Sequence, residues 1–357
     1  MNSAVSSTNS LTVLVIAGGR SSERDVSLST GAAVCRGLSD AGMSVLTFDP
    51  ALPHPPIEWK PENAGKRIEM IPPTPEQLAS GAPVGVALTP RDLTRVDFKN
   101  IDLVFIALHG GDGENGRLQA LLDAAGIAYT GSGMASSAMA MDKHASKRLF
   151  IAEQIPTPRW RVLDRGESLT FETARAQLGT PLIVKPNAQG STVGLTLVKE
   201  SGQWRQALED AFRWDDRILI EEYIDGRELT VGVLGDEPLP VVEIIPEHGL
   251  YDYECKYTSG RSQYICPADL TPEQTQALQD LGLRAFRALD CSGYARSDFR
   301  LSSQGLFYCL EVNTLPGMTA TSLVPKAARA AGIEFPELLA RICRLAVDAH
   351  ARRTPSG

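Results

Sequence analysis

Hydrophobic and polar positions alternate in blocks along the first third of the chain. Short apolar runs, typical of buried strands, are separated by segments whose apolar residues recur at helical spacing. The run at 101–108 is apolar apart from Asp102, as expected for a strand covered on both faces of a parallel sheet. The predicted elements are, in order, strand 11–17, helix 26–38, strand 45–48, strand 101–108, helix 118–125 and strand 127–129. This order predicts an α/β fold whose N-terminal domain, residues 1–130, is doubly wound.

The pattern changes after residue 130, where short apolar strands follow one another with fewer helices between them. Apolar residues first recur at helical spacing from Ala138 to Leu149. The strands predicted next are 160–163, 182–185, 193–199, 217–224, 228–234, 241–245, 295–301 and 306–313, with helices at 270–289 and 339–350. We divide this part into a central domain, 131–224, and a C-terminal domain, 225–357.

Two long segments lack a clear period. Residues 50–100 are rich in proline and predict an irregular, partly helical stretch. Residues 246–267 are polar and tyrosine-rich. A loop of that length inside a compact domain is usually functional, and we predict that it is a lid.

Charged side chains occupy alternate positions on two predicted strands near the C-terminus. Arg296 and Asp298 share one face of their strand, as Glu311 and Asn313 do on the next. If the strands pair through the turn at 302–305, the four side chains converge. The oxygens of Asp298, Glu311 and Asn313 are of the type that Mg²⁺ prefers. A salt-bridged solvent face is the alternative. It is disfavoured by the apolar residues predicted for the opposite faces, namely Phe299, Leu301, Leu310 and Val312.

A lysine at the end of a predicted strand precedes a glycine-bearing loop. The loop at 187–192 offers backbone N–H groups and hydroxyls that, with the Lys185 ammonium, could surround a phosphate. The lysine comes before the loop, unlike the P-loop order, and the glycines at 18–19 do not form a dinucleotide fingerprint. Considered alone, the segment could also be an ordinary hairpin, as could the carboxylate-bearing segment 219–228.

Composition narrows the class of protein. With 357 residues, of which 43% are hydrophobic and 22% charged, the chain is long enough for two or three domains. The formal net charge of −8 argues against non-specific binding of nucleic acid, which needs a basic face. No apolar run is long enough to span a membrane, and the first ten residues lack the pattern of a secretory signal. The six cysteines are scattered without a C-x-x-C pair, which fits reduced thiols, so a cytoplasmic protein is expected.

Six segments together resemble the ATP-grasp superfamily and, within it, the D-alanine–D-alanine ligases. They are GGRSSERDVSL (18–28), LHGGDGENG (108–116), MDK (141–143), KPNAQGSTVG (185–194), YDYECKY (251–257) and EVNTLPGMT (311–319) with SLVP (322–325). The resemblance runs from about residue 12 to about residue 348 in the right order. It implies a three-domain ATP-grasp fold that holds ATP between the central and C-terminal domains. It also implies two bound metal ions, either Mg²⁺ or Mn²⁺, and a homodimer.

The resemblance also implies roles at the nucleotide. Lys143 and Lys185 would hold the ATP phosphates, and the backbone at 222–224 would meet adenine. Glu221 and Glu228 would contact adenine and ribose. The full set implied for the nucleotide is Lys143, Lys185, Glu221, Glu222, Ile224, Glu228 and Lys256, the last on the lid, and the set for the metal is Asp298, Glu311 and Asn313. Glu222 stands where relatives often carry lysine, which affects only a backbone contact.

A further group of residues would bind the amino acids. By the same resemblance, Glu23 receives the amino group of the first D-alanine. Its supporting residues are Ser191 and Tyr257, with His109 nearby. Arg296 and the N–H of Gly317 would form the oxyanion site, and Ser322 would meet the carboxylate of the second D-alanine.

The implied activity is ATP-dependent joining of two D-alanine molecules, through a D-alanyl phosphate, for peptidoglycan precursor synthesis. Such a mechanism needs positive charge around the transferring phosphoryl group and a lid that keeps water from the acylphosphate. One alternative is a D-alanine–D-lactate ligase, against which Tyr257 argues. The other is an inactive nucleotide-binding regulator. That protein would have lost at least one of Lys185, Arg296, Asp298, Glu311 and Asn313, which are all present.

Overall fold

The N-terminal sheet is built around β1 (Thr12–Ile16), whose residues 13–16 are fully buried. The computed structural model describes residues 11–60, 88–247 and 261–353. β1 pairs in parallel with β2 (Ser44–Phe48) on one side and β4 (Leu103–Ile106) on the other. The short β3 (Ile57–Glu58) adds to β2 in antiparallel fashion, so the strand order is β3-β2-β1-β4. The predicted α/β arrangement of parallel, buried strands is confirmed.

Helices connect these strands as the apolar spacing predicted. α1 leads from β1 to β2, and α4 follows β4. The helices of this part are α1 (Arg24–Asp40), α3 (Pro90–Leu93), η3 (Phe98–Asn100), η4 (Gly111–Gly113) and α4 (Arg117–Ala124). The predicted strand at 127–129 is wrong, because Tyr129 makes only an isolated bridge, to Val104.

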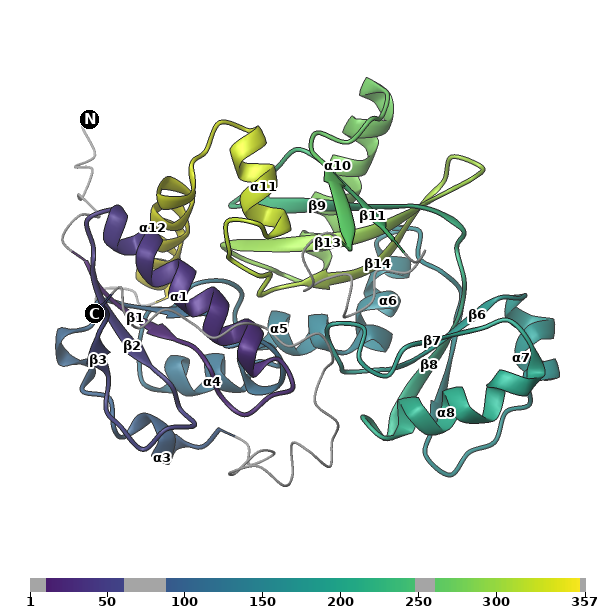
Figure 1. The fold of residues 1–357 in the computed structure, drawn as a ribbon, viewed down its shortest axis with the longest axis horizontal. Coiled ribbons are helices and arrows are strands. Elements are labelled where there is room, and N and C mark those ends of the chain that lie inside the picture. Colours follow the sequence, from purple (N-terminus) through teal and green to yellow (C-terminus); the bar gives the residue numbers. More distant parts are fainter. Residues whose placement is uncertain (1–10, 61–87, 248–260, 354–357) are drawn as a thin grey trace.

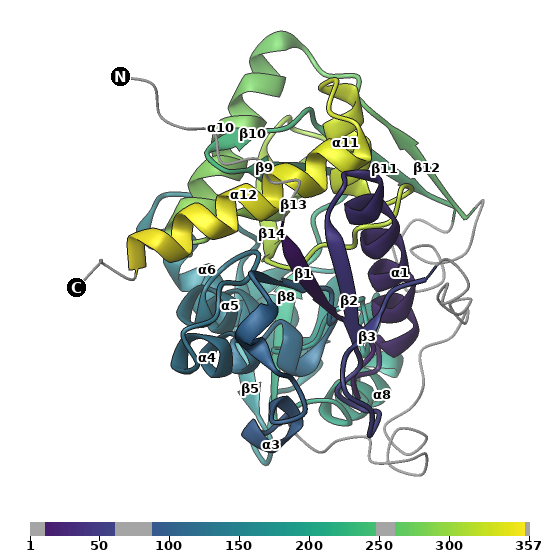
Figure 2. The ribbon, with the colours of Figure 1, turned by 90° about the vertical axis from the view of Figure 1, so that its left-hand side faces the viewer.

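The last helix of the chain packs against this first sheet. α12 (Phe335–Arg353) contacts both α1 and β4, and Figure 2 shows it beside α1. Its buried Leu338, Leu339 and Ile342 belong to the same apolar cluster as the core of β1. α1 can approach closely because Gly37 has no side chain: a Cβ there would lie 2.5 Å from Leu339 Cδ1.

The helical segment predicted from Ala138 to Leu149 is interrupted by Asp142. The structure has two helices, α5 (Met134–Met141) and α6 (Lys143–Ala152). Asp142 caps α6, since its Oδ1 accepts a hydrogen bond from the Ala145 N–H at 2.9 Å.

The second sheet is small and antiparallel, with the order β5-β8-β6-β7. Helices that the sequence analysis did not predict cover it, and Figure 1 shows them on the right of the molecule. The elements are β5 (Trp160–Asp164), α7 (Phe171–Leu178), β6 (Leu182–Pro186), β7 (Thr196–Val198), η5 (Ser201–Gln203), α8 (Trp204–Phe212) and β8 (Arg217–Glu222).

The third sheet is also antiparallel, with the order β12-β11-β9-β13-β14 and with β10 paired to β9. α10 packs on β9 and β13. The elements are β9 (Gly226–Leu234), β10 (Glu237–Pro238), β11 (Val242–Pro246), β12 (Ser262–Ile265), α10 (Pro272–Ala288), β13 (Tyr294–Ser302), β14 (Phe307–Asn313) and α11 (Leu323–Ala330).

The pairing of β13 with β14 confirms the predicted convergence. Asp298 faces Glu311, and Arg296 faces Asn313. The register shifts between Asp298 and Phe299, so the prediction that Leu310 lies on the apolar face is wrong. The irregularity makes Leu310 an extra residue that lines a cavity, and Cys309 takes the fully buried position opposite Phe299.

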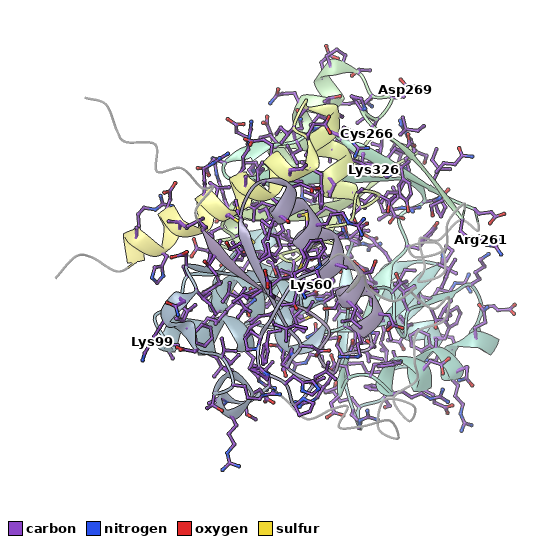
Figure 3. The ribbon with its side chains drawn as sticks, turned by 60° about the vertical axis from the view of Figure 1, so that its left-hand side comes forward. Lys60, Lys99, Arg261, Cys266, Asp269 and Lys326 are labelled. Carbon is purple, nitrogen blue, oxygen red and sulfur yellow. The ribbon has the colours of Figure 1, made fainter. Side chains whose placement is uncertain are left out.

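β12 is attached to α11 through two residues that Figure 3 shows close together, Cys266 and Lys326. The Cys266 thiol donates to the Lys326 carbonyl at 3.9 Å, and the Lys326 ammonium lies 5.2 Å from the centre of the Tyr264 ring.

Of the predicted lid, 246–267, residues 248–260 lie outside the described part of the chain. The proposed domain limits at 130 and 224 remain a prediction. Within the described ranges, no helix is both long enough and apolar enough to span a bilayer.

Candidate functional site

Two cavities meet between the three sheets. The larger, of about 300 Å³, lies against α1, β13, β14 and the start of α11, and the smaller, of about 130 Å³, lies between the second and third sheets. They share a wall formed by Lys143, Glu311 and the loop residues Gln189, Gly190 and Ser191. Molecules that fill the two cavities would therefore contact the same five residues from either side.

Most predicted site residues line these two cavities. The larger holds Glu23, His109, Lys143, Ser191, Arg296, Glu311, Asn313, Gly317 and Ser322. The smaller holds Lys143, Lys185, Ser191, Glu221, Glu222, Ile224, Glu228, Asp298 and Glu311. Lys256 and Tyr257 lie outside the described residues.

Glu23 lies at the N-terminus of α1, buried in the larger cavity. The Ser191 hydroxyl donates a hydrogen bond to Glu23 Oε1, so the loop after β6 is tied to the first domain. Two glycines make room for the carboxylate. A Cβ at Gly110 would lie 2.9 Å from Glu23 Oε2, and one at Gly190 would lie 3.0 Å from it. The carboxylate therefore has a fixed position from which it can accept further hydrogen bonds from a ligand.

The loop that carries Ser191 has an uncommon backbone conformation. Ser191 has φ 50° and Thr192 has φ 63°, in the left-handed region that residues other than glycine rarely adopt. Such conformations concentrate at ligand-binding segments, where the surrounding structure holds them in place.

His109 is buried beside Glu23 and is held by two side chains. Its Nε2 lies 2.9 Å from Thr30 Oγ1, and its Nδ1 lies 3.3 Å from Glu114 Oε1. The Ser21 hydroxyl donates to the His109 carbonyl at 2.6 Å. The ring orientation is thus set by α1 and by the segment after β4.

The paired strands β13 and β14 bring charge to the wall between the cavities. Arg296 donates twice to Asp298, from Nε at 2.8 Å and from Nη2 at 2.7 Å. The Lys143 ammonium lies 3.1 Å from Glu311 Oε2 and donates to the Gln189 carbonyl at 2.7 Å. Asn313 accepts from the Leu315 N–H at 2.9 Å.

These oxygens fit a hard divalent cation that also binds phosphate. Asp298 and Glu311 face each other in register, with Asn313 on the same side of β14. Among the described residues, no group of three or more histidine, cysteine, aspartate or glutamate side chains is placed to hold a metal ion. Mg²⁺ is commonly held by one or two carboxylates plus substrate phosphates, and such a small ligand set suits that mode.

Gly317 and Ser322 lie next to each other where α11 begins. The Ser322 hydroxyl accepts from the Thr319 N–H at 3.1 Å and lies 2.8 Å from Thr319 Oγ1. A Cβ on Gly317 would come within 3.1 Å of Ser322 Oγ. The N–H groups at the N-terminus of α11 favour a carboxylate there.

Glu221 forms a buried cluster with two lysines at the inner end of the smaller cavity. The Lys147 ammonium lies 2.5 Å from Glu221 Oε1, and the Lys185 ammonium lies 2.5 Å from Oε2. Burial disfavours the ionised carboxylate, but the charges and hydrogen bonds of both lysines outweigh burial and hold the pKa of Glu221 below its ordinary value. Lys147 also donates to Thr157 Oγ1 at 2.7 Å and to the Pro158 carbonyl at 2.9 Å.

Sequence reasoning missed Lys147 and Arg300. Lys147 is one helical turn after Lys143 on α6, and Arg300 follows Asp298 by two positions on β13. The helical period of 3.6 residues and the strand period of two therefore put each on the same face as a residue that was named. Glu222, in contrast, was named, and its carboxylate accepts from the Arg159 N–H and from Arg159 Nε, both at 2.7 Å.

The thiol nearest the charged strands is not a nucleophile. Cys309 lies on β14, two residues before Glu311, and is fully buried. Burial raises the pKa of its thiol well above the usual value, so the reactive thiolate is absent at neutral pH.

Two family models match the chain. The model described as D-ala D-ala ligase N-terminus matches residues 12–132, and the one described as D-ala D-ala ligase C-terminus matches residues 149–344. Together they cover all three sheets.

Curated relatives match along nearly the whole length. A D-alanine–D-alanine ligase of Syntrophotalea carbinolica is 41% identical over 335 residues, which is 92% of this chain and 94% of the relative. That of Gloeobacter violaceus is 41% identical over 338 residues, which is 94% of this chain and 99% of the relative.

Solved structures show the same fold. The D-alanine–D-alanine ligase of Bacillus anthracis, complexed with ATP, superposes with a TM-score of 0.76 at 31% identity and covers 96% of this chain and 100% of that one. The D-alanine–D-alanine ligase of Coxiella burnetii superposes with a TM-score of 0.78 at 28% identity and covers 97% of this chain and 96% of that one. The chain belongs to the D-alanine–D-alanine ligase family and has its ATP-grasp fold.

Proposed function

We propose that this chain joins two D-alanine molecules in an ATP-dependent reaction that passes through a D-alanyl phosphate and releases ADP and phosphate. The observation that carries the proposal is the common wall of the two cavities. A γ-phosphate at the Lys143 end of the smaller cavity would face a carboxylate bound in the larger. Phosphorylation turns that carboxylate, a poor acylating agent, into a reactive one.

The smaller cavity would bind ATP. Lys143 and Lys185 would hold the phosphates, because both side chains line this cavity. Glu221 and Glu228 would accept hydrogen bonds from adenine and ribose, and the backbone of Glu222 and Ile224 would meet the base edge. Lys256 would add a contact from the lid.

Asp298, Glu311 and Asn313, together with the phosphates, would hold two metal ions, either Mg²⁺ or Mn²⁺. When bound, the metal would neutralise charge on the phosphoryl group as it transfers. Lys143 would then exchange part of its contact with Glu311 for the phosphate.

The larger cavity would bind both amino acids. Glu23 would receive the amino group of the first D-alanine, with Ser191 and Tyr257 as its partners and His109 beside it. Ser322 and the start of α11 would bind the carboxylate of the second. The amine of that second molecule would attack the acylphosphate carbon, and the negative oxygen formed there would be met by Arg296 and the Gly317 N–H.

We further propose a three-domain division at residues 130 and 224, a homodimer, and a cytoplasmic location. The location is supported by the need for ATP and by the free cysteines among the described residues. Size-exclusion chromatography with light scattering tests the dimer.

The decisive experiment measures ADP release with D-alanine, L-alanine and D-lactate as substrates, with mass analysis of the product. We expect release with D-alanine alone and a dipeptide as product. A mixed ester formed from D-alanine and D-lactate in preference to the dipeptide would overturn the proposed acceptor. The absence of ADP release with any of them would overturn the activity.

A further inference from the structure

Arg300 lines the smaller cavity but has no part in the roles proposed above. It lies on β13, two residues after Asp298, and only 6% of its surface is exposed. Burying a positive charge costs free energy unless it is paired and hydrogen-bonded, so the Arg300 guanidinium requires specific partners.

Three groups around the guanidinium supply those partners. Arg300 Nε donates to the Ile224 carbonyl at 3.0 Å, and its Nη1 lies 3.2 Å from Glu228 Oε2. Its Nη2 donates to the Tyr223 hydroxyl at 3.2 Å, and the cation lies 5.4 Å from the centre of that ring. All the nitrogens of one planar group are therefore used.

The backbone makes this arrangement rigid. Arg300 and Glu228 are direct cross-strand partners in the β9–β13 pair, which Figure 1 shows side by side. Ile224 lies in the short connection between β8 of the second sheet and β9 of the third. Arg300 thus joins the peptide at residue 224 to a side chain fixed in the third sheet.

We infer that Arg300 is a positioning residue that sets the selectivity of the site for a ribonucleotide. The inference rests on the proposed nucleotide site. Arg300 holds the Ile224 peptide, on the side of the base, at a fixed separation from the Glu228 carboxylate, on the side of the ribose. A carboxylate can accept about four hydrogen bonds, so the contact with Arg300 leaves capacity for ribose hydroxyls. Because the carboxylate is held in place, a nucleotide that lacks one of the ribose hydroxyls loses binding free energy.

Lysine can replace this arginine only in part. The guanidinium is a planar fork that reaches a carbonyl and a carboxylate together, whereas an ammonium is a point charge on a flexible stem. A purely structural ion pair would behave differently, because its loss would weaken the fold without changing the preference among nucleotides.

The test compares ATP with 2′-deoxy-ATP and 3′-deoxy-ATP in the ADP-release assay with D-alanine. For each protein, the ratio of kcat/KM for ATP to that for each analogue measures ribose discrimination. In Arg300→Met we expect at least one ratio to fall about tenfold, the value of one hydrogen bond to a charged group. Arg300→Lys should show a smaller fall.

Arg227→Met is the matched control. Arg227 precedes Glu228 on β9 and pairs with Glu243 through two contacts of 2.6 Å, but it lines neither cavity. Its ratios should equal those of the parent. In a Glu228→Gln background, Arg300→Met should lower the ratios no further, because the arginine acts through that carboxylate.

Unchanged ratios in folded Arg300→Met would overturn the inference, even if activity with ATP falls. If thermal melts show that this variant is unfolded, unchanged ratios in Arg300→Lys overturn it instead. A parent that uses all three nucleotides equally would also overturn it. A parent that releases no ADP with D-alanine would refute the proposed function, which is a separate outcome.

Discussion

Lys147→Met removes a fully buried charge next to the nucleotide cavity. The ammonium contacts Glu221 Oε1 at 2.5 Å and donates to Thr157 and to the Pro158 carbonyl. Methionine is also unbranched and fills most of the same volume. The substitution therefore tests the charge and its hydrogen bonds with little change in packing.

The cost can be estimated from the geometry of the cluster. Removing one partner of a buried ion pair costs about 3–5 kcal/mol. Because the Lys185 ammonium remains 2.5 Å from the other oxygen of Glu221, we expect a loss near the lower limit, about 3 kcal/mol of unfolding free energy. Lys185 must then neutralise Glu221 alone, so it is less available to phosphate, and KM for ATP should rise about tenfold with a smaller change in kcat.

Thermal unfolding and ADP release at varied ATP measure the two effects separately. In the double variant Lys147→Met/Glu221→Gln, the buried Lys185 ammonium loses its carboxylate partner. The double variant should therefore be less stable than Lys147→Met alone.

The pH dependence has a definite sign. Since the pKa of Glu221 is depressed in the folded protein, its contribution to stability is present at neutral pH and is lost as the pH falls. Without Lys147 that pKa rises toward its unfolded-state value, so the loss of stability on acidification should be smaller and should be complete at a higher pH. An unchanged KM for ATP would mean that Lys147 serves only the fold. Unchanged stability would refute the charge argument itself.

Three further predictions concern other parts of the molecule. Glu311→Gln should abolish turnover, with partial recovery at higher Mg²⁺, and near-normal turnover at limiting Mg²⁺ would contradict its role as a metal ligand. Arg296→Ala should lower kcat by about 10²–10³, as for the loss of an oxyanion donor, while KM for ATP moves far less. A rise in KM for ATP with kcat unchanged would instead mean that Arg296 binds the nucleotide in the ground state. Gly282→Ala should cost about 1–3 kcal/mol of stability, by overpacking, because its Cβ would lie 2.8 Å from Val231 Cβ. Calorimetry checks this, and the turnover of the folded protein should be unchanged.

The charged face of β13 and β14 could be predicted because a short turn and a period of two determine which residues meet. The alternation predicted that Arg296 and Asp298 share a face with Glu311 and Asn313, and the structure pairs them across the two strands. Leu310 was misplaced because an irregularity in register leaves no mark on the hydrophobic pattern.

Residues whose partners come from another part of the fold were harder to predict. Lys147 and Arg300 stand at the correct periods, but a charged residue on a helix or strand is ordinarily solvated. Only the tertiary structure shows that the buried Glu221 and the partly buried Glu228 lie beside them. The break at Asp142, by contrast, had a local signal, an N-cap residue at the start of a helix.

The packing of α12 against the first sheet has a consequence for how the chain acquires its structure. β1 is synthesised long before Leu338 and Leu339, yet all three belong to one apolar cluster. N-terminal domains usually fold first during translation, but here the surface that α12 covers stays open until residues 335–353 have emerged. A shortened protein that ends before residue 335 would expose the face of α1 around Gly37, together with apolar residues of β4. Folding and aggregation of the N-terminal part should therefore depend on whether synthesis is completed.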